Sequence, residues 1–331
     1  MTAPPQVPGG IDAQPEAIVA GIEAKAIQGR SLRQIAWIRL KRDKVALAGG
    51  AIIVLLILIA ISALLLDRVF GVLNPNAFHQ ELIDTETLAP KGFFGGMSGE
   101  HPLGVEPVNG RDLLVRVYAG SWISLLVASG ATLLSVLIGT TLGIIAGYFG
   151  GWIDALIARL MDIFLAFPLL VFAIALAGVI PDTAFGLSGD TLRIALLIFI
   201  IGFFNWPYIG RIVRGQTISL REREFVDAAR SLGARSSWVL MRELLPNLAA
   251  PILVYATLLI PTNILFEAAL SFLGVGIRPP TATWGGMLAD AVKFYTLPHF
   301  MLWPGLAIFI TVLAFNLFGD GLRDALDPRG R

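Results

Sequence analysis

The sequence predicts an all-α polytopic membrane protein with six transmembrane helices. Of its 331 residues, 56% are hydrophobic and only 15% are charged, whereas a soluble domain carries about 25% charged residues. A soluble protein with buried helices is the alternative, but a globular chain of this length would still need a polar surface. Six apolar runs of roughly 17–25 residues supply the spans, because that length crosses about 30 Å of hydrocarbon.

The elements follow along the chain. Residues 1–30 are rich in Pro, Gly, Ala and Gln, which predicts a disordered or loosely helical extension. Residues 31–44 mix Trp37 with basic side chains, so we expect a short interfacial helix with Ser31 as its N-cap. A solvated basic linker is the alternative. The six spans are predicted at residues 45–66, 122–146, 163–180, 194–210, 248–266 and 300–318.

Charges between the spans predict the orientation. Lys and Arg gather in residues 30–44 and in the 211–247 loop, whereas acidic residues outnumber basic ones in 67–121. Basic loops tend to stay in the cytoplasm. Both termini, including the 319–331 tail, and the 211–247 loop are therefore expected to be cytoplasmic, and 67–121 extracytoplasmic. Residues 122–318 would form a core domain of five spans.

Several classes of function are disfavoured by what the sequence lacks. Cysteine is absent, and the three histidines lie far apart, so no metal-ligand spacing is present. A net charge of +1 predicts no nucleic-acid partner. Without a phosphate-binding loop or a catalytic motif, the chain is expected to be no enzyme and to bind no cofactor, so any ATPase would be another chain. Glu267 is a lone interior carboxylate, which disfavours a proton-coupled pump.

Small residues form a stripe in the second span. Gly139, Gly143 and Gly147 recur at a spacing of four, which places them on one helix face. Close packing against a neighbouring helix is the favoured interpretation. Direct contact with a transported molecule is the alternative.

A polar, arginine-rich insert separates the fourth and fifth spans. Residues 222–232 favour a short helix, which Gly233 is placed to end in a left-handed C′ position. A second helix, N-capped by Ser236, is predicted to end at Leu245 because Pro246 disfavours helix in the residue before it.

The insert carries side chains too apolar for a free loop: Phe225, Leu232, Trp238 and Leu240. They fit two interpretations, packing on the chain's own bundle or lipid headgroups, and docking of a partner protein. A DNA-binding helix-turn-helix is disfavoured because the insert is tethered to the membrane at both ends.

The pattern Asp227-Ala-Ala-x-x-x-Gly233, followed by Leu245-Pro246, resembles the EAA loop of ABC importer permeases. In that family the loop is a coupling helix that sits in a cleft of the ATPase subunit. Asp227 stands where the family has Glu, and Glu243 where it has an apolar residue or His. The resemblance assigns ATPase coupling to Glu224, Asp227, Ala228, Ala229, Arg230, Gly233, Leu245 and Pro246.

Further segments resemble the C-type subunit of dipeptide and oligopeptide importers. They are His101-Pro-Leu-Gly104, Gly110-Arg-Asp112, Glu267-Ala-Ala-Leu-Ser-Phe-Leu-Gly274 and the run 319–328. Val105-Glu106 stands where the family commonly has Thr-Asp.

The resemblance implies a type I ABC importer permease bundle in the bacterial inner membrane, surrounded by lipid. The implied partners are a second homologous permease, two ATPase subunits that carry ATP and Mg, and an extracytoplasmic substrate-binding protein. Residues 67–121 and 272–299 are candidates for contacting the binding protein, and no substrate-pathway residue is assigned. Peptide is the expected cargo, with metal chelates such as nickel complexes, or glycosides, as alternatives. A self-sufficient secondary transporter or channel is the alternative of a different class.

Overall fold

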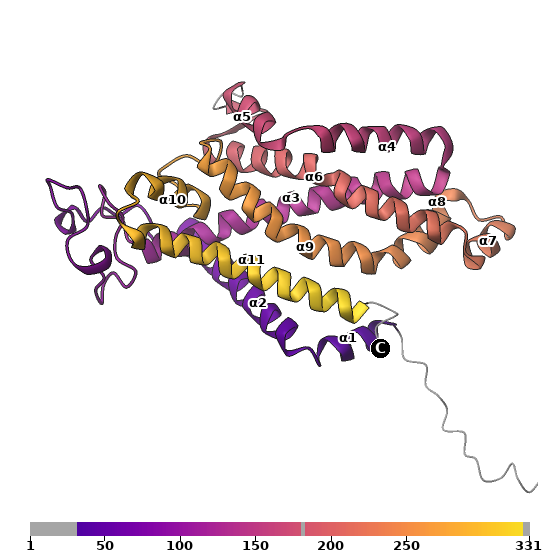
Figure 1. Ribbon diagram of the computed structural model, residues 1–331, viewed down its shortest axis with the longest axis horizontal. Coiled ribbons are helices and arrows are strands. Elements are labelled where there is room, and N and C mark those ends of the chain that lie inside the picture. The colour runs from indigo at the N-terminus through magenta and orange to yellow at the C-terminus, as the bar shows by residue number, and fades with distance from the viewer. Residues whose placement is uncertain (1–31, 180–182, 327–331) are drawn as a thin grey trace, which may run out of the picture.

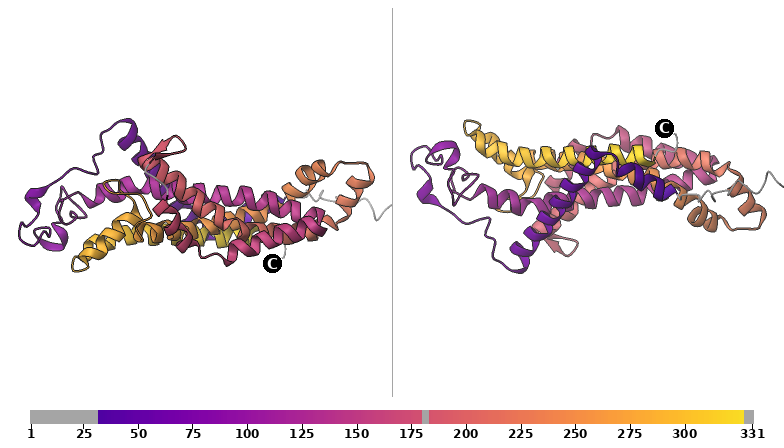
Figure 2. Two further views of the ribbon diagram at one scale, coloured as in Figure 1. Left: turned by 90° about the horizontal axis from the view of Figure 1, so that it is seen from above. Right: turned by 90° about the horizontal axis from the view of Figure 1, so that it is seen from below.

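Long apolar helices lie side by side and form an elongated bundle (Figures 1 and 2). The structure is a computed structural model that describes residues 32–179 and 183–326, so the predicted Ser31 cap and residues 1–30 and 327–331 lie outside it. Within the described part, five helical segments are long and apolar enough to cross a membrane. They contain α2 (Lys44–Leu64), α3 (Leu113–Phe149), α6 (Gly189–Arg221), α9 (Leu245–Phe272) and α11 (Pro298–Leu326). The prediction of an all-α membrane protein is confirmed.

The third predicted span, at 163–180, is wrong in its bounds and in its shape. The chain forms α4 (Gly151–Ala166) and α5 (Leu169–Val179), and the two helices are bent by 78°. Pro168 has no N–H and disfavours helix in Phe167, whose backbone is extended at φ −78° and ψ 126°. Counted as one bent span, this pair makes the sixth crossing.

The start of this span is hidden in the sequence by the charges of α4. Asp154 and Asp162 point to α6, where Arg214 Nη2 donates to Asp154 Oδ2 at 2.7 Å and Arg211 Nη2 donates to Asp162 Oδ1 at 2.9 Å. Because charged residues lower the local hydropathy, these two carboxylates interrupt the apolar run in the sequence. The partners that neutralise them come from a helix some fifty residues later.

Side-chain caps set the starts of α2 and α3 ahead of their apolar runs. Asp43 caps α2 by accepting from the backbone N–H groups of Val45 and Ala46 at 2.9 and 3.0 Å. Asp112 caps α3 by accepting from Val115 N at 2.9 Å. The short helix expected over residues 31–44 is present but shorter, as α1 (Leu32–Leu40), because the chain turns at residues 41–42 and Asp43 caps α2.

The glycine stripe packs α3 against α6. A Cβ atom on Gly139 would lie 2.6 Å from the carbonyl oxygen of Trp206, and one on Gly143 would lie 2.7 Å from that of Gly210. A Cβ on Gly147 would meet Thr217 Cβ at 2.6 Å. The two helix backbones therefore touch, and the packing interpretation of the stripe is confirmed.

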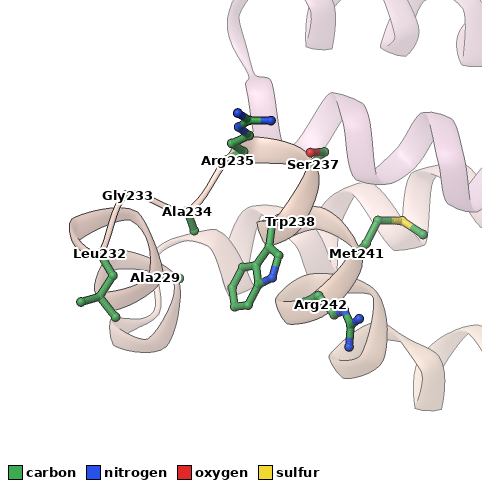
Figure 3. A pocket seen from close by; sticks show the side chains of 9 residues that line it. All are labelled: Ala229, Leu232, Gly233, Ala234, Arg235, Ser237, Trp238, Met241 and Arg242. Atoms are coloured by element: carbon green, nitrogen blue, oxygen red, sulfur yellow. The ribbon is translucent and has the colours of Figure 1, made fainter.

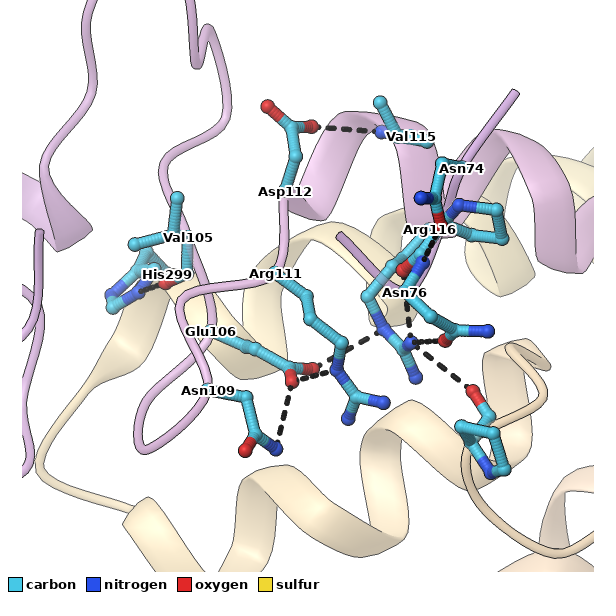
Figure 4. Close-up of polar contacts among 12 residues, drawn as sticks. Asn74, Asn76, Val105, Glu106, Asn109, Arg111, Asp112, Val115, Arg116 and His299 are labelled. Atoms are coloured by element: carbon cyan, nitrogen blue, oxygen red, sulfur yellow. Dashed lines mark hydrogen bonds and ion pairs between the residues drawn. The ribbon is translucent and has the colours of Figure 1, made fainter. Parts of the chain in front are cut away.

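The segment between α2 and α3 and the short helix α10 (Trp284–Ala291) lie at one end of the bundle, opposite α7 (Glu224–Ser231) (Figure 1). Buried ionic contacts among Glu106, Arg111 and Arg116 hold this end of the bundle together (Figure 4). We call this region the outer junction. Glu106 pairs with Arg111 and lies 3.2 Å from Arg116 Nε. Arg116 Nη1 donates to Asn76 Oδ1 at 3.0 Å and to the carbonyl oxygens of Pro75 and Pro280 at 3.2 Å. One guanidinium thus joins three distant segments.

Short elements connect the long helices, among them the helical turns η3 (Leu65–Val69), η4 (Gln80–Leu82), η5 (Phe93–Gly95) and η7 (Val292–Phe294). Between α5 and α6, β1 (Thr183–Ala184) pairs antiparallel with β2 (Leu187–Ser188). Between α7 and α9 the chain forms α8 (Ser236–Trp238) and the π-helical turn η6 (Val239–Leu244).

Candidate functional site

The first half of the insert is the two-turn helix α7. Glu224 and Asp227 lie in its first turn and Arg230 in its last, where their charges complement the helix dipole. Glu224, Asp227, Ala228 and Ser231 are all exposed. Their spacing of three and four places them on one outward helix face.

Gly233 ends α7 in the left-handed conformation, as predicted, with φ +82°. The N–H of Gly233 donates to the carbonyl of Arg230 at 2.9 Å, and the N–H of Ala234 donates to that of Ala229 at 3.0 Å. This pair of bonds is a Schellman motif, which satisfies carbonyls left free at a helix end. The turn directs the chain back towards the bundle.

The second half of the insert differs from the prediction. A helix starts at Ser236, but Arg235 is the N-cap residue and no side chain caps it. The helix does not end at Leu245 either, because α8 and η6 continue without a break into α9, with Pro246 in the first turn of α9. A wider π-helical turn just before Pro246 accommodates the missing N–H.

One face of the insert packs on the chain's own bundle. Val226 is fully buried and Ala229 nearly so, in a cluster with Ile144 of α3 and Val213 of α6. The guanidinium of Arg230 lies 5.0 Å above the Tyr148 ring near the end of α3, which is cation–π contact range. The packing interpretation therefore holds for this face.

The other face opens as a groove between α7 and the start of the second helix (Figure 3). Its volume is 690 Å³, and it is lined by Ala229, Leu232, Gly233, Ala234, Arg235, Ser237, Trp238, Met241 and Arg242. Leu232 is 89% exposed and Met241 63% exposed, and Trp238 lies between them. Two arginines and no carboxylate line the groove within the described part of the chain.

The eight residues assigned to coupling do not form one patch. Gly233 and Ala229 line the groove, although the Ala229 side chain is buried. Glu224, Asp227 and Ala228 occupy the outward face of α7, and Arg230 is exposed beside them. Leu245, half-buried, and Pro246, exposed, lie in the first turn of α9.

Arg235, Ser237, Met241 and Arg242 belong to the groove but were not assigned from the sequence. For three of these four residues, the sequence itself contains a signal. Positions 235, 238, 241 and 242 recur at helical spacing, so one helix face carries two arginines, a Trp and a Met. Because Pro246 predicts a helix end at Leu245, the sequence alone does not show this face as part of a helix that continues into α9.

The chain matches, over residues 139–331, the family described as binding-protein-dependent transport system inner membrane component. The chain belongs to this family. The N-terminal transmembrane domain of oligopeptide transport permease C matches residues 31–77. This chain is thus a multi-pass permease component of a bacterial inner-membrane ABC transporter.

Relatives match this permease component over most of its length. A dipeptide transport system permease protein of Alkalihalophilus pseudofirmus is 42% identical over 296 residues, which is 89% of each chain. A glutathione transport system permease protein of Escherichia coli O157:H7 is 40% identical over 294 residues, 88% of this chain and 89% of the relative. An oligopeptide transport system permease protein of Haemophilus influenzae is 38% identical over 321 residues, 96% and 94% of the two chains.

Proposed function

We propose that this permease works in an ATP-driven importer and that its 222–246 insert docks separate ATPase subunits, while the chain itself is not an enzyme. The observation that carries the proposal is the division of the insert into two faces. Val226 and Ala229 anchor it to the bundle, whereas Leu232, Trp238 and Met241 surround an open groove. Exposed apolar clusters of this kind favour a protein partner.

The anchored face supplies the mechanical link. A partner that pushes α7 would move Val226 and the Arg230–Tyr148 contact, and with them the ends of α3 and α6. ATP binding at the partner would in this way bias a two-state bundle. The proposal places the insert and both termini in the cytoplasm. The basic residues of the insert and its position opposite the outer junction support this orientation.

Peptides are the proposed cargo. The three relatives are named for dipeptide, glutathione and oligopeptide transport, and these cargoes share amide bonds and short length. A second permease and an extracytoplasmic binding protein complete the proposed importer, with residues 67–121 and 272–299 facing the binding protein. Metal chelates and glycosides are the alternative cargoes, and the uptake assay described below distinguishes them from peptides.

Two equally exposed side chains at opposite ends of the bundle test the docking surface. Leu232 is 89% exposed and Phe93 is 88% exposed. Leu232→Asp should remove the ATPase subunits that copurify with the complex, whereas Phe93→Asp should retain them. Full ATPase association in Leu232→Asp would contradict the assignment.

The importer class is tested by reconstitution in proteoliposomes. Uptake of a radiolabelled dipeptide should require the binding protein, the second permease, the ATPases and ATP. Uptake by the purified chain alone, without ATP, would instead indicate a secondary transporter or channel. Uptake of a nickel chelate or a glycoside without dipeptide uptake would overturn the peptide cargo.

A further inference from the structure

A groove of 340 Å³ lies between α6 and α9. Tyr208, Tyr255, Thr262 and Phe266 line it together with Asn205 and four aliphatic side chains. Asn205 is at the midpoint of α6, sixteen residues from Gly189 and sixteen from Arg221. The groove therefore lies at mid-membrane depth rather than at either surface.

The polarity of this groove separates it from a surface that faces lipid. Tyr208 is 55% exposed, and Thr262 is exposed too. On α2, by contrast, Val54, Leu55 and Leu58 are 56–58% exposed and purely apolar. Polar side chains at bilayer depth face a bundle interior or a water-filled cavity. The hydroxyl groups of the groove thus favour water, whereas α2 favours lipid.

A series of buried side-chain hydrogen bonds links the helices behind the groove. Asn205 Nδ2 donates to Asn263 Oδ1 at 2.8 Å, and Asn263 Nδ2 donates to Thr132 Oγ1 at 2.8 Å. These bonds cross from α6 to α9 to α3, and all three side chains are buried. Interhelical hydrogen bonds of this type lock helices in register. These bonds therefore hold α6 and α9, the two helices that form the groove, in register behind its open side.

We infer that this groove is the chain's own wall of the translocation pathway and that it accepts peptides through neutral hydrogen bonds and aromatic contacts. None of the nine described residues that line it is charged. A wall without fixed charge neither repels nor traps a charged side chain, so acidic and basic dipeptides pass alike. This inference rests on the proposed peptide import, and the tests below separate the two.

The absence of cysteine from the chain makes the wall directly testable. Thr262→Cys and Tyr208→Cys are compared with Val54→Cys, whose position on α2 is 57% exposed. The probe is a permanently charged methanethiosulfonate reagent, applied to the complete transporter in membranes and read as a mass shift of this chain. Because the thiolate is the reactive form and requires water, the groove cysteines should react at least about tenfold faster than the α2 cysteine.

Equal, slow reaction at all three positions would overturn the inference, because lipid or a helix of the second permease would then cover the groove. This readout needs no knowledge of the cargo. It therefore stays informative even if dipeptide import itself fails.

The neutrality of the wall is tested by adding one charge. Thr262→Glu should lower uptake of an acidic dipeptide relative to a basic one by about tenfold, through like-charge repulsion in a confined space. Thr262→Gln introduces a side chain of the same shape as glutamate but without its charge. It should therefore leave the ratio of acidic to basic dipeptide uptake at its wild-type value. Uptake of a neutral dipeptide measures any general loss of activity.

An unchanged ratio in Thr262→Glu, with uptake retained, would place the cargo elsewhere. If Thr262→Glu abolishes all uptake, the cysteine reactivities still decide the inference. Absence of dipeptide uptake by the wild-type complex would instead contradict the proposed function, whatever the cysteines show.

Discussion

The outer junction around Arg116 and the insert around Val226 are held by different interactions. Arg116 is 3% exposed and bonds side chains or carbonyls from three segments, beside the Glu106–Arg111 pair. Val226 and Ala229 pack in an apolar cluster with residues of α3 and α6. Buried charges tolerate few arrangements because each loses its partners when displaced, whereas apolar contact is non-directional. The outer junction is therefore suited to hold a fixed geometry, and the insert to transmit movement.

The largest expected effect breaks the outer junction. Arg116→Met should destabilise the protein by about 3–5 kcal/mol, since it leaves Glu106 with one partner fewer in a buried site. The measurement is the thermal unfolding temperature of the purified protein in detergent. Arg68→Met is the control, because Arg68 pairs with Asp67 while its side chain is 51% exposed, and such pairs contribute less than about 1 kcal/mol. Equal losses in the two variants would contradict the role of Arg116.

The next effect separates binding from stability at the insert. Trp238→Ala should weaken ATPase association by about 2 kcal/mol, roughly thirtyfold in Kd, and leave the unfolding temperature unchanged, because Trp238 is 47% exposed. Titration of the purified ATPase subunit onto the permease complex gives the affinity. Phe185→Ala, at a side chain that is 89% exposed in the β1–β2 hairpin, should change neither quantity. A lower unfolding temperature in Trp238→Ala would indicate packing instead of docking.

A smaller effect concerns the turn that positions α7. Gly233 and Gly215 both have open space where a Cβ would lie, but only Gly233 has a positive φ. Gly233→Ala should cost about 1 kcal/mol through left-handed strain, whereas Gly215→Ala, inside α6, should be neutral or stabilising. Hydrogen exchange of the α7 amides reports the difference. Faster exchange in both variants, or in neither, would exclude strain at Gly233 as the cause.

The smallest effect is a pH dependence of the outer segment. Backbone N–H groups of Thr87 and Glu86 donate to the Asp84 carboxylate and hold its pKa below the ordinary value. A lowered pKa stabilises the fold above the ordinary pKa, and this stabilisation is lost as pH falls through the lowered one, below about pH 4. Proteolysis of the 84–88 turn should therefore rise as pH falls from about 5 to about 3. Asp84→Asn should flatten that rise, and an identical pH profile in the variant would contradict it.

Much of the bundle follows from local sequence. Uninterrupted apolar length predicts the five long spans, since backbone groups in lipid must be satisfied within a helix. The predicted bounds of the third span are wrong because Asp154 and Asp162 interrupt the apolar run, and the arginines that pair with them belong to α6. The sequence of residues 151–166 alone does not show that these arginines will pair with the two carboxylates.

The insert, too, has one feature that the local sequence predicts and one that it does not. Gly233 was predictable because a helix followed by glycine is a local signal. The groove was not, because it requires the second helix to continue into α9, where a π-helical turn ahead of Pro246 overrides the usual effect of proline. Ala229, assigned to docking from its motif, is buried because α7 lies on α3 and α6.

By itself, the sequence determined the membrane class, five of the six spans, the glycine stripe and the turn at Gly233, because each depends on neighbours along the chain. The tertiary structure decided which helix the stripe meets, how Arg116 closes the outer junction, and where polar groups gather between α6 and α9. Those features join residues from tens to more than a hundred positions apart, as in the contact of Arg116 with Pro280. Such contacts form only when the helices pack together.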